Sequence, residues 1–204
     1  MNVGVLAIQG GFAEHQKALQ LVGVSSFEIR KLSDLQQSFD ALILPGGEST
    51  VIGHLLHETQ LFSPLKTMID NDLPVWGTCA GMILLARTIE DEQKSYFGKI
   101  PITVKRNAFG RQLGSFHMTG TCSGIGEIPM TFIRAPFIKD AEEEVQILSS
   151  VNGFGVAATY RNVLVTSFHP ELTDNLKVLK YFLQRSQENA RETMSQFFAV
   201  PAFT

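Results

Sequence analysis

The chain has 204 residues, of which 44% are hydrophobic and 18% are charged, so it is long enough to bury one sizeable core. Its net charge of −3, without a cluster of lysine and arginine, argues against nucleic acid as a partner. No apolar run approaches the roughly 20 residues of a membrane-spanning helix, no secretory signal is recognisable, and two distant cysteines suggest no disulfide framework, which indicates a protein of the reducing cytoplasm.

The N-terminal half alternates short apolar runs with helical patterns. Residues 2–8 form a β-branched run typical of a buried strand, and residues 12–22 carry apolar side chains at helical spacing before Gly23 ends the helix. Three more strands are predicted at 27–32, 40–47 and 73–77, and three more helices at 51–56, 62–69 and 82–86. Ser49 or Thr50 is the expected cap of the helix at 51–56. Apolar strands that alternate with helices predict a parallel sheet covered on both faces.

From about residue 100 the pattern changes to short strand-like runs, at 99–107, 130–136, 144–153, 154–162 and 163–170. Asn152 and Gly153 predict a tight hairpin turn between two of them. A closing helix is expected from 174 to 192, with an apolar stripe of Leu176, Leu179, Phe182 and Leu183. The apolar last residues, 197–204, are expected to fold back on the core.

No linker, repeat or low-complexity segment divides the chain. We therefore expect a single domain, residues 1–204, of the α/β class. Its mostly parallel central sheet is expected to carry helices on both faces in a flavodoxin-like three-layer arrangement, with an inserted β-rich region.

One short motif contains a candidate nucleophile. Residues 77–81 read Gly-Thr-Cys-Ala-Gly, the thiol form of a nucleophile elbow, in which a sharp strand-to-helix turn exposes the reactive side chain. Glycine is expected on both sides of Cys79 because a side chain there would collide with a neighbouring strand or helix. The amides and dipole at the start of the next helix favour the thiolate. A small cysteine that only packs in the core is the alternative interpretation.

A thiol nucleophile usually requires a base, and His169 is the strongest candidate among five histidines. It ends an apolar strand and is followed by Pro170 and Glu171. Residues two apart in an extended segment point the same way, so Glu171 can hold the imidazole while the other ring nitrogen faces Cys79. The alternative is a histidine that only satisfies its own hydrogen bonds at a strand end.

Two backbone amides are candidates for an oxyanion hole. The amide of Ala80 directly follows the nucleophile. The glycine turn at residues 45–49, which includes Gly47, permits close backbone approach and is the best source of a second donor. The alternative for this second segment is an ordinary tight turn between a strand and a helix.

The remaining histidines and the second cysteine carry no expected chemistry. His54 and His57 are three residues apart on a helix, but no third ligand with suitable spacing is visible, so we expect neither a metal nor another cofactor. His15 is expected on the surface or at the end of a helix, and His117 in the β-rich region. Cys122 is expected to be a structural or exposed thiol.

Six segments together resemble the class I, triad-type glutamine amidotransferases, and within that family the glutaminase subunits of pyridoxal 5′-phosphate synthase. They are LAIQGGFAEH, LILPGGEST, GTCAGMILLA, RNAFGRQ, FIRAP and SFHPELT, in the family order from residue 6 to residue 173. Many other class I glutaminases have Leu-Gly after the nucleophile, where this chain has Ala80 and Gly81. The resemblance implies the class I glutamine amidotransferase-like fold.

The resemblance also implies a reaction, the hydrolysis of L-glutamine to L-glutamate and ammonia. Cys79 attacks the side-chain amide, His169 protonates the leaving ammonia, and Glu171 orients His169. Water then hydrolyses the glutamyl thioester.

The substrate contacts that the resemblance implies come from Gly47, Glu48, Ser49, Arg106, Ile133 and Arg134. These residue types suit free glutamine, because a guanidinium can bind its α-carboxylate and Glu48 can take its α-ammonium. The alternatives are a surface or strand-edge role for Arg106 and Arg134. Glu48 can also stabilise the start of the following helix, where a negative charge is favourable, and this role is compatible with substrate binding.

The loop at Gln9 and Gly10 lies, in the family, at the junction with the synthase subunit, and its backbone rearranges when the two subunits meet. Glycine suits a peptide that must change its dihedral angles. The resemblance therefore implies a hetero-oligomer with the synthase, low activity alone, and ammonia that travels inside the complex.

Two other functions are compatible with the same pattern. One is a glutaminase that feeds a different synthase, for histidine, anthranilate or guanylate. The other is a non-catalytic regulatory module of the same fold, against which the intact Cys79, His169 and Glu171 argue. A thiol protease is disfavoured, because the papain-type sequence around the cysteine is absent and the order Cys-His-Glu differs from that of α/β-hydrolases.

Overall fold

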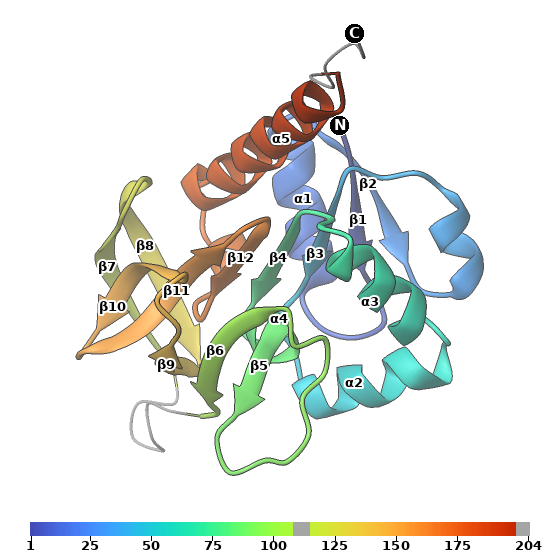
Figure 1. Ribbon diagram of the computed structural model, residues 1–204. Helices are drawn as coiled ribbons and strands as arrows, with labels where there is room; N and C mark the ends of the chain where they lie inside the picture. Colours follow the sequence, from blue (N-terminus) through green and yellow to red (C-terminus); the bar gives the residue numbers. More distant parts are fainter. Residues whose placement is uncertain (108–114, 199–204) are drawn as a thin grey trace, which may run out of the picture.

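The computed structural model describes residues 1–107 and 115–198, and its central feature is one large mixed sheet (Figure 1). Within these residues the sheet contains ten strands: β1 Asn2–Leu6, β2 Ser25–Ile29, β3 Ala41–Leu44, β4 Val75–Thr78, β5 Ala86–Ile89, β6 Ile100–Lys105, β9 Phe137–Ala141, β10 Gln146–Val151, β11 Phe154–Tyr160 and β12 Val163–Thr166. Their order is β2-β1-β3-β4-β12-β11-β9-β6-β5, and β10 pairs with β11 beside this path.

The half of the sheet that contains the N-terminal strands is parallel, as predicted. Strands β2, β1, β3, β4 and β12 are successive neighbours and all run the same way. The helices are α1 Phe12–Leu21, α2 Ser49–Glu58, α3 Phe62–Asp70, α4 Ala80–Leu85 and α5 Lys177–Phe198. None of the helices within the described part of the chain is both long and apolar enough to cross a membrane.

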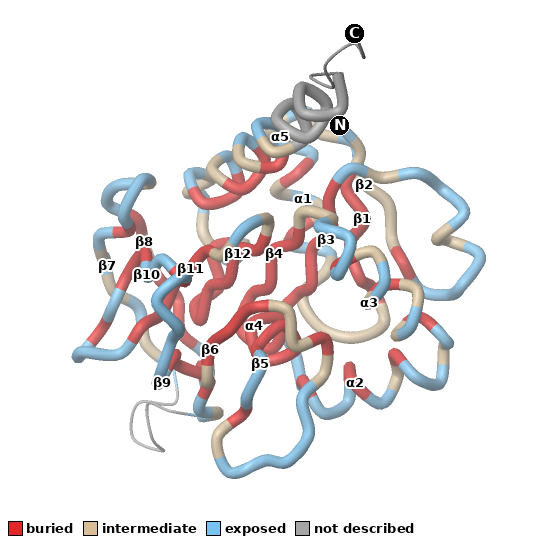
Figure 2. The backbone as a smooth tube through the Cα atoms, viewed as in Figure 1, coloured by how far each residue is buried: buried red, intermediate tan, exposed pale blue. Residues whose placement is uncertain are grey.

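Each parallel strand sends alternate side chains into two separate cores, because successive residues of a strand point to opposite faces. Leu42, Leu44 and Val75 pack in the core beneath α2, α3 and α4. Ile43 and Trp76, from the same strands, pack in the core beneath α1 and α5. Figure 2 shows the resulting buried centre along β1, β3, β4 and β12. The apolar runs in the sequence are therefore strands covered on both faces, which confirms the three-layer prediction.

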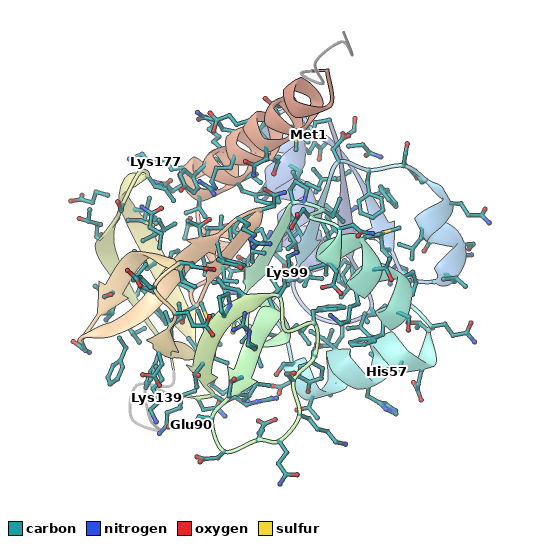
Figure 3. The ribbon with its side chains drawn as sticks, in the orientation of Figure 1. Met1, His57, Glu90, Lys99, Lys139 and Lys177 are labelled. Atoms are coloured by element: carbon teal, nitrogen blue, oxygen red, sulfur yellow. The ribbon has the colours of Figure 1, made fainter. Side chains whose placement is uncertain are left out.

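The β-rich region extends the main sheet. Strand β11 pairs antiparallel with β12, and β9 and β6 continue the sheet to its far edge at β5. Strands β7 Ser115–Cys122 and β8 Gly126–Ile133 form a separate two-stranded sheet over the α5 core. At the far edge Glu90 accepts a hydrogen bond from Lys139 at 2.5 Å and forms an ion pair with Lys105 at 2.8 Å, and Figure 3 labels Glu90 and Lys139 side by side.

The predicted hairpin turn is confirmed. Val151 of β10 pairs with Phe154 of β11, which leaves Asn152 and Gly153 as a two-residue turn. Their φ angles of 52° and 83° are the positive values that the tight hairpin turn requires and that asparagine and glycine tolerate.

Several predicted boundaries are wrong for local reasons. The second strand ends at Ile29, because the Asp34 carboxylate accepts hydrogen bonds from the backbone amides of Arg30 and Lys31 and turns the chain into a short 3₁₀ helix, η1 Leu32–Gln36. The sequence prediction missed β5, β7 and β9. The closing helix begins at Lys177, three residues later than predicted.

The predicted side-chain cap of α2 is also wrong. The helix begins at Ser49, its N-cap residue is Glu48, and no side chain caps it. The hydroxyls of Ser49 and Thr50 instead accept hydrogen bonds from Arg106. The prediction for the last residues cannot be compared, because 199–204 lie outside the described residues.

Candidate active site

The candidate residues converge because four parallel strands end at the same edge of the sheet. Gln9 follows β1, Gly47 follows β3, Cys79 follows β4 and His169 follows β12. In open α/β sheets the crevice beyond the carboxyl ends of the strands is where ligands bind. The fold therefore brings together segments that are up to 160 residues apart in the sequence.

Cys79 lies on a strained turn between β4 and α4. Its φ of 48° and ψ of −100° are unusual for any residue with a side chain. A Cβ atom on Gly77 would collide with the backbone of Gly81, and one on Gly81 would collide with the carbonyl oxygen of Leu44. The backbone amide of Cys79 donates to the Thr166 carbonyl of β12 at 2.7 Å. Close packing on both sides thus fixes the thiol at the sheet edge.

His169 is held in place by its backbone and by its ring. Its amide donates to the Thr131 carbonyl at 2.8 Å, and its Nδ1 lies 2.6 Å from Oε1 of Glu171. The thiol of Cys79 is among the groups that raise the pKa of this ring. Gly46 leaves room for the ring, because a Cβ atom there would overlap Cε1 of His169. The structure therefore pairs His169 with Glu171 and places both on the wall of the cavity that Cys79 lines.

The electrostatics of the three groups favour an imidazolium beside an ionised carboxylate. Burial of the His169 ring lowers its pKa, but hydrogen bonds to Cys79 and Glu171 and the negative charges of both outweigh burial and raise the pKa to about 10. Burial of the Glu171 carboxyl raises its pKa, yet His15 and the hydrogen bond from His169 bring that pKa below its ordinary value.

A cavity of about 370 Å³ opens beside Cys79. With the exception of Ala80, every residue that the sequence singled out for the site lines it: Gln9, Gly10, Gly47, Glu48, Ser49, Cys79, Arg106, Ile133, Arg134, His169 and Glu171. Ala80 is 1% exposed and directly follows Cys79 as the first residue of α4. The size of the cavity and the mixture of polar and charged groups suit a small polar ligand.

Two arginines on the cavity wall are held by carboxylates. Arg106 pairs with Glu92 through Nε, at 2.6 Å from Oε1, and its Nη1 donates to the Ser49 hydroxyl at 2.7 Å. Arg134 donates to Oε1 of Glu48 at 2.7 Å and has a positive φ of 43°. Both guanidinium groups thus reach the cavity with their orientation fixed by a second side chain.

The loop at Gln9 and Gly10 lies against the glycine turn after β3. Oε1 of Gln9 accepts a hydrogen bond from the Glu48 amide at 2.9 Å. Gly10 has a φ of 102°, and a Cβ atom there would overlap the carbonyl oxygen of Gly46. Only glycine allows the two backbones to approach this closely.

The structure also places the residues for which no chemistry was expected. Cys122 is buried, and burial raises its pKa to about 11, so it is a structural thiol. His117 lies on β7, as predicted. His54 lies 3.1 Å from Glu58, and His57, which Figure 3 labels on α2, stacks on Phe62 with ring centroids 4.3 Å apart. Of the segment RNAFGRQ, only Arg106 and Asn107 lie within the described residues.

The prediction that His15 lies on a surface is wrong. Its side chain is 1% exposed, and its Nε2 lies 3.1 Å from the Thr78 hydroxyl and 3.7 Å from Oε2 of Glu171. The sequence contained an indication of this position, because His15 precedes the buried Leu19 by four residues and therefore shares its face of α1.

Comparison with known proteins gives concordant results over nearly the whole chain. The SNO glutamine amidotransferase family matches residues 5–188. The chain is 53% identical to a "Pyridoxal 5'-phosphate synthase subunit PdxT" of Haemophilus influenzae (strain PittEE), over 90% of this chain and 97% of that protein. It is 50% identical to the protein of the same name from Streptococcus pneumoniae (strain ATCC 700669 / Spain 23F-1), over 93% of this chain and 100% of that protein.

Solved structures agree. A crystal structure of a glutamine amidotransferase superposes with a TM-score of 0.85 at 38% identity, over 91% of this chain and 98% of that one. PurLQS from Thermotoga maritima superposes with a TM-score of 0.64 at 14% identity, over 90% of this chain and 97% of that one, and shares the fold alone.

Proposed function

The chain belongs to the SNO glutamine amidotransferase family, and we propose that it releases ammonia from L-glutamine through a Cys79-His169-Glu171 triad and passes it to a partner synthase. It is a glutaminase subunit of pyridoxal 5′-phosphate synthase: the family is described as glutamine amidotransferases, and the relatives at 50% and 53% identity are named as a subunit of that synthase. The observation that carries the triad is the pairing of His169 with Glu171 at 2.6 Å on the wall of the same cavity that Cys79 lines.

The first half of the reaction forms a thioester. The Sγ thiolate of Cys79 attacks the side-chain carbonyl carbon of glutamine and pushes the carbonyl electrons onto oxygen. When the tetrahedral intermediate collapses, the carbon–nitrogen bond breaks and the His169 imidazolium gives its proton to the leaving nitrogen, which departs as ammonia. Glu171 keeps the ring oriented and stabilises its positive charge, as the carboxylate of a triad does.

The second half reverses these roles. His169, now neutral, takes a proton from a water molecule as the water oxygen attacks the thioester carbon. The carbon–sulfur bond then breaks, and the thiolate of Cys79 and the imidazolium of His169 are restored. The new carboxyl group loses its proton to solvent, and the product leaves as glutamate. Each turnover therefore consumes one water and releases one ammonia.

The oxyanion of both tetrahedral intermediates requires two donors, for which we propose the amides of Ala80 and Gly47. Ala80 is the first residue of α4, directly after the nucleophile. Gly47 lines the cavity on the opposite loop, close to the Gln9 side chain. Two backbone donors fixed before the reaction stabilise the developing charge without reorganisation.

Recognition of free glutamine is assigned to the charged wall of the cavity. Arg106, with Ser49, is placed to take the α-carboxylate, and Glu48 the α-ammonium. Arg134 and the backbone of Ile133 complete the wall, and the Ile133 carbonyl oxygen lies 3.9 Å from Sγ of Cys79. Glu48 and Arg134 pair at 2.7 Å, so the wall offers one acidic and one basic side chain next to each other.

The partner is proposed to be the synthase subunit that consumes the ammonia. Released ammonia would be protonated in water and lose its nucleophilicity, so transfer within a complex preserves it. The loop at Gln9 and Gly10 supports a conformational response to this partner, because it touches both Glu48 and the glycine turn that carries Gly47. We assign the whole reaction to one domain, residues 1–204, and to the cytoplasm, where a catalytic thiol stays reduced.

The decisive experiment measures ammonia release from glutamine by the purified chain with and without the pyridoxal 5′-phosphate synthase subunit. We expect a low rate alone and a clearly higher rate with the synthase. Histidine, anthranilate and guanylate synthase subunits serve as matched controls and should not raise the rate. Equal rates with and without the synthase would count against a conformational response of the loop at Gln9 and Gly10. Stimulation by a control subunit would count against the assigned partner.

A further inference from the structure

We propose that His15 is a positioning residue of this glutaminase, which holds the second carboxylate oxygen of Glu171 with a proton on its Nε2 and thereby keeps Glu171 in place behind His169. The inference rests on the function proposed above and adds a fourth side chain to the three of the triad.

The geometry around Glu171 leaves one carboxylate oxygen for His15. The Glu171 side chain is 1% exposed, and its Oε1 is taken by Nδ1 of His169 at 2.6 Å. Its Oε2 is buried and accepts no hydrogen bond from the side chains and backbone described by the structure. Nε2 of His15 lies 3.7 Å from this oxygen, and the His15 side chain is likewise 1% exposed. Two buried polar groups therefore face each other away from water.

The position of His15 is fixed by β4. Its Nε2 lies 3.1 Å from the Thr78 hydroxyl, one residue before the nucleophile, and its ring meets Trp76 edge-on with centroids 5.2 Å apart. A polar atom buried among such groups costs free energy unless it has a partner. For Nε2 of His15 that partner is the Thr78 hydroxyl. Oε2 of Glu171, 3.7 Å from the same nitrogen, has no hydrogen-bond partner among the described residues, so the imidazole is placed to act on Glu171.

The charge state of His15 determines how it acts. Burial lowers its pKa, and this outweighs the attraction of Glu171, so the ring is neutral. The other charged groups that face it are His169, which also lowers the pKa, and Glu14 on the same helix, which raises it. A neutral ring carries its proton on one nitrogen only. A proton on Nε2 attracts the Glu171 carboxylate. With the proton on Nδ1 instead, the lone pair of Nε2 would face the carboxylate and repel it.

The stabilisation of Glu171 by His15 matters most while the thioester exists. At that stage His169 has given up its proton, and Glu171 no longer has a cation beside it. The Nε2–H group of His15 then remains as the polar partner that keeps the carboxylate ionised and in position for the hydrolytic step. Because His15 does not line the cavity, its loss is expected to lower kcat and leave KM nearly unchanged.

A first test uses the unmodified chain without any partner. Two-bond ¹H–¹⁵N spectra of the protein labelled at its histidines distinguish the two neutral tautomers. We expect His15 to carry its proton on Nε2 at neutral pH. A proton on Nδ1, or a doubly protonated ring, would overturn the proposal.

A second test compares His15→Phe, His15→Gln and, as a matched control on the exposed face of α2, His54→Phe. For each folded variant we would measure the pKa of His169 by NMR and kcat and KM in the complex with the synthase. We expect His15→Phe to lower the pKa of His169 and to lower kcat about tenfold, equivalent to one pKa unit. His15→Gln, whose amide nitrogen can replace Nε2, is expected to restore both, and His54→Phe to change neither.

A folded His15→Phe variant with an unchanged His169 pKa would overturn the proposal even if kcat fell, because that result would indicate a packing role only. If His15→Phe does not fold, the tautomer measurement alone decides. A wild-type complex without glutaminase activity would instead contradict the proposed function, and it would leave the tautomer and pKa results to be judged separately.

Discussion

At the scale of single residues, the proposed chemistry depends on one thiol, whose position is fixed by close packing of the neighbouring backbone. Cys79 has a φ of 48° at the end of β4, and its neighbours Gly77 and Gly81 cannot carry a side chain without a backbone collision. The sequence predicted this feature well, because the pattern Gly-x-Cys-x-Gly is local. It missed His15, because that residue touches Glu171 only through tertiary packing.

Substitution of the nucleophile tests its role directly. Cys79→Ala keeps a Cβ atom at the strained turn, so we expect the unfolding midpoint in urea to change little. Ammonia release by the complex with the synthase is expected to fall by about 10⁴-fold or more, as for other lost nucleophiles. Cys122→Ala is the matched control, because that thiol is buried on β7 away from the site. Full activity of Cys79→Ala would exclude the thioester route.

The raised pKa of His169 predicts a pH dependence of stability. Because the folded-state value is about 10, above the ordinary value near 6.5, the imidazolium stabilises the fold fully below about pH 6.5. This contribution is lost as the pH rises toward 10. We therefore expect His169→Gln to reduce the free energy of unfolding more at pH 6 than at pH 10, measured with urea. A difference that is constant, or that grows with pH, would contradict the assignment.

Arg106 is expected to act in binding. Its guanidinium is fixed by Glu92 and Ser49 at the cavity wall. Arg106→Ala removes the proposed partner of the substrate carboxylate, and the loss of a charged hydrogen bond is expected to raise KM for glutamine about 10- to 100-fold. Arg87→Ala is the control, since Arg87 pairs with Glu142 outside the cavity. An unchanged KM in steady-state assays of Arg106→Ala would remove this residue from the binding site.

At the scale of elements, the site is built by the elbow between β4 and α4 and by the neighbouring strands. We expect Gly81→Ala to destabilise the fold by about 1–3 kcal/mol, because its Cβ atom meets the backbone of Leu44 rather than a movable side chain. Gly11→Ala is the matched control, since a Cβ atom there meets only Glu14 and Glu171 at ordinary distances of 3.4 Å and 3.8 Å. Urea unfolding of the two variants measures the difference, and equal stability would show that the elbow tolerates a side chain.

The strands that the sequence did not predict were missed for a common reason. Strand β5 has only four residues and directly follows α4, and β9 pairs with β6 and β11 from distant parts of the chain. Strand β7, with the sequence SFHMTGTC, is rich in polar residues and glycine. None of the three carries a local hydrophobic period long enough to be recognised. The parallel strands are covered on both faces and are therefore apolar throughout. This continuous apolar run is what made them predictable from the sequence.

At the scale of the whole molecule, the parallel sheet explains why a local motif becomes a site. The sequence predicted that Cys79, His169 and Glu171 act together, and the parallel pairing of β4 with β12 explains how segments so far apart in the chain meet. The supporting contacts could not be predicted from the sequence. Examples are the ion pair of Glu92 with Arg106 and the approach of His15 to Glu171, each of which joins segments that are remote along the chain.

The central claim, that Cys79 is a nucleophile prepared for glutamine, is tested most directly by a diazoketone analogue of glutamine. The complex with the synthase would be treated with 6-diazo-5-oxo-L-norleucine, and its peptides mapped by mass spectrometry. We predict one adduct per chain, on the sulfur of Cys79, with none on Cys122 and strong protection by excess glutamine. Absence of an adduct at Cys79, or equal labelling of Cys122, would contradict the account.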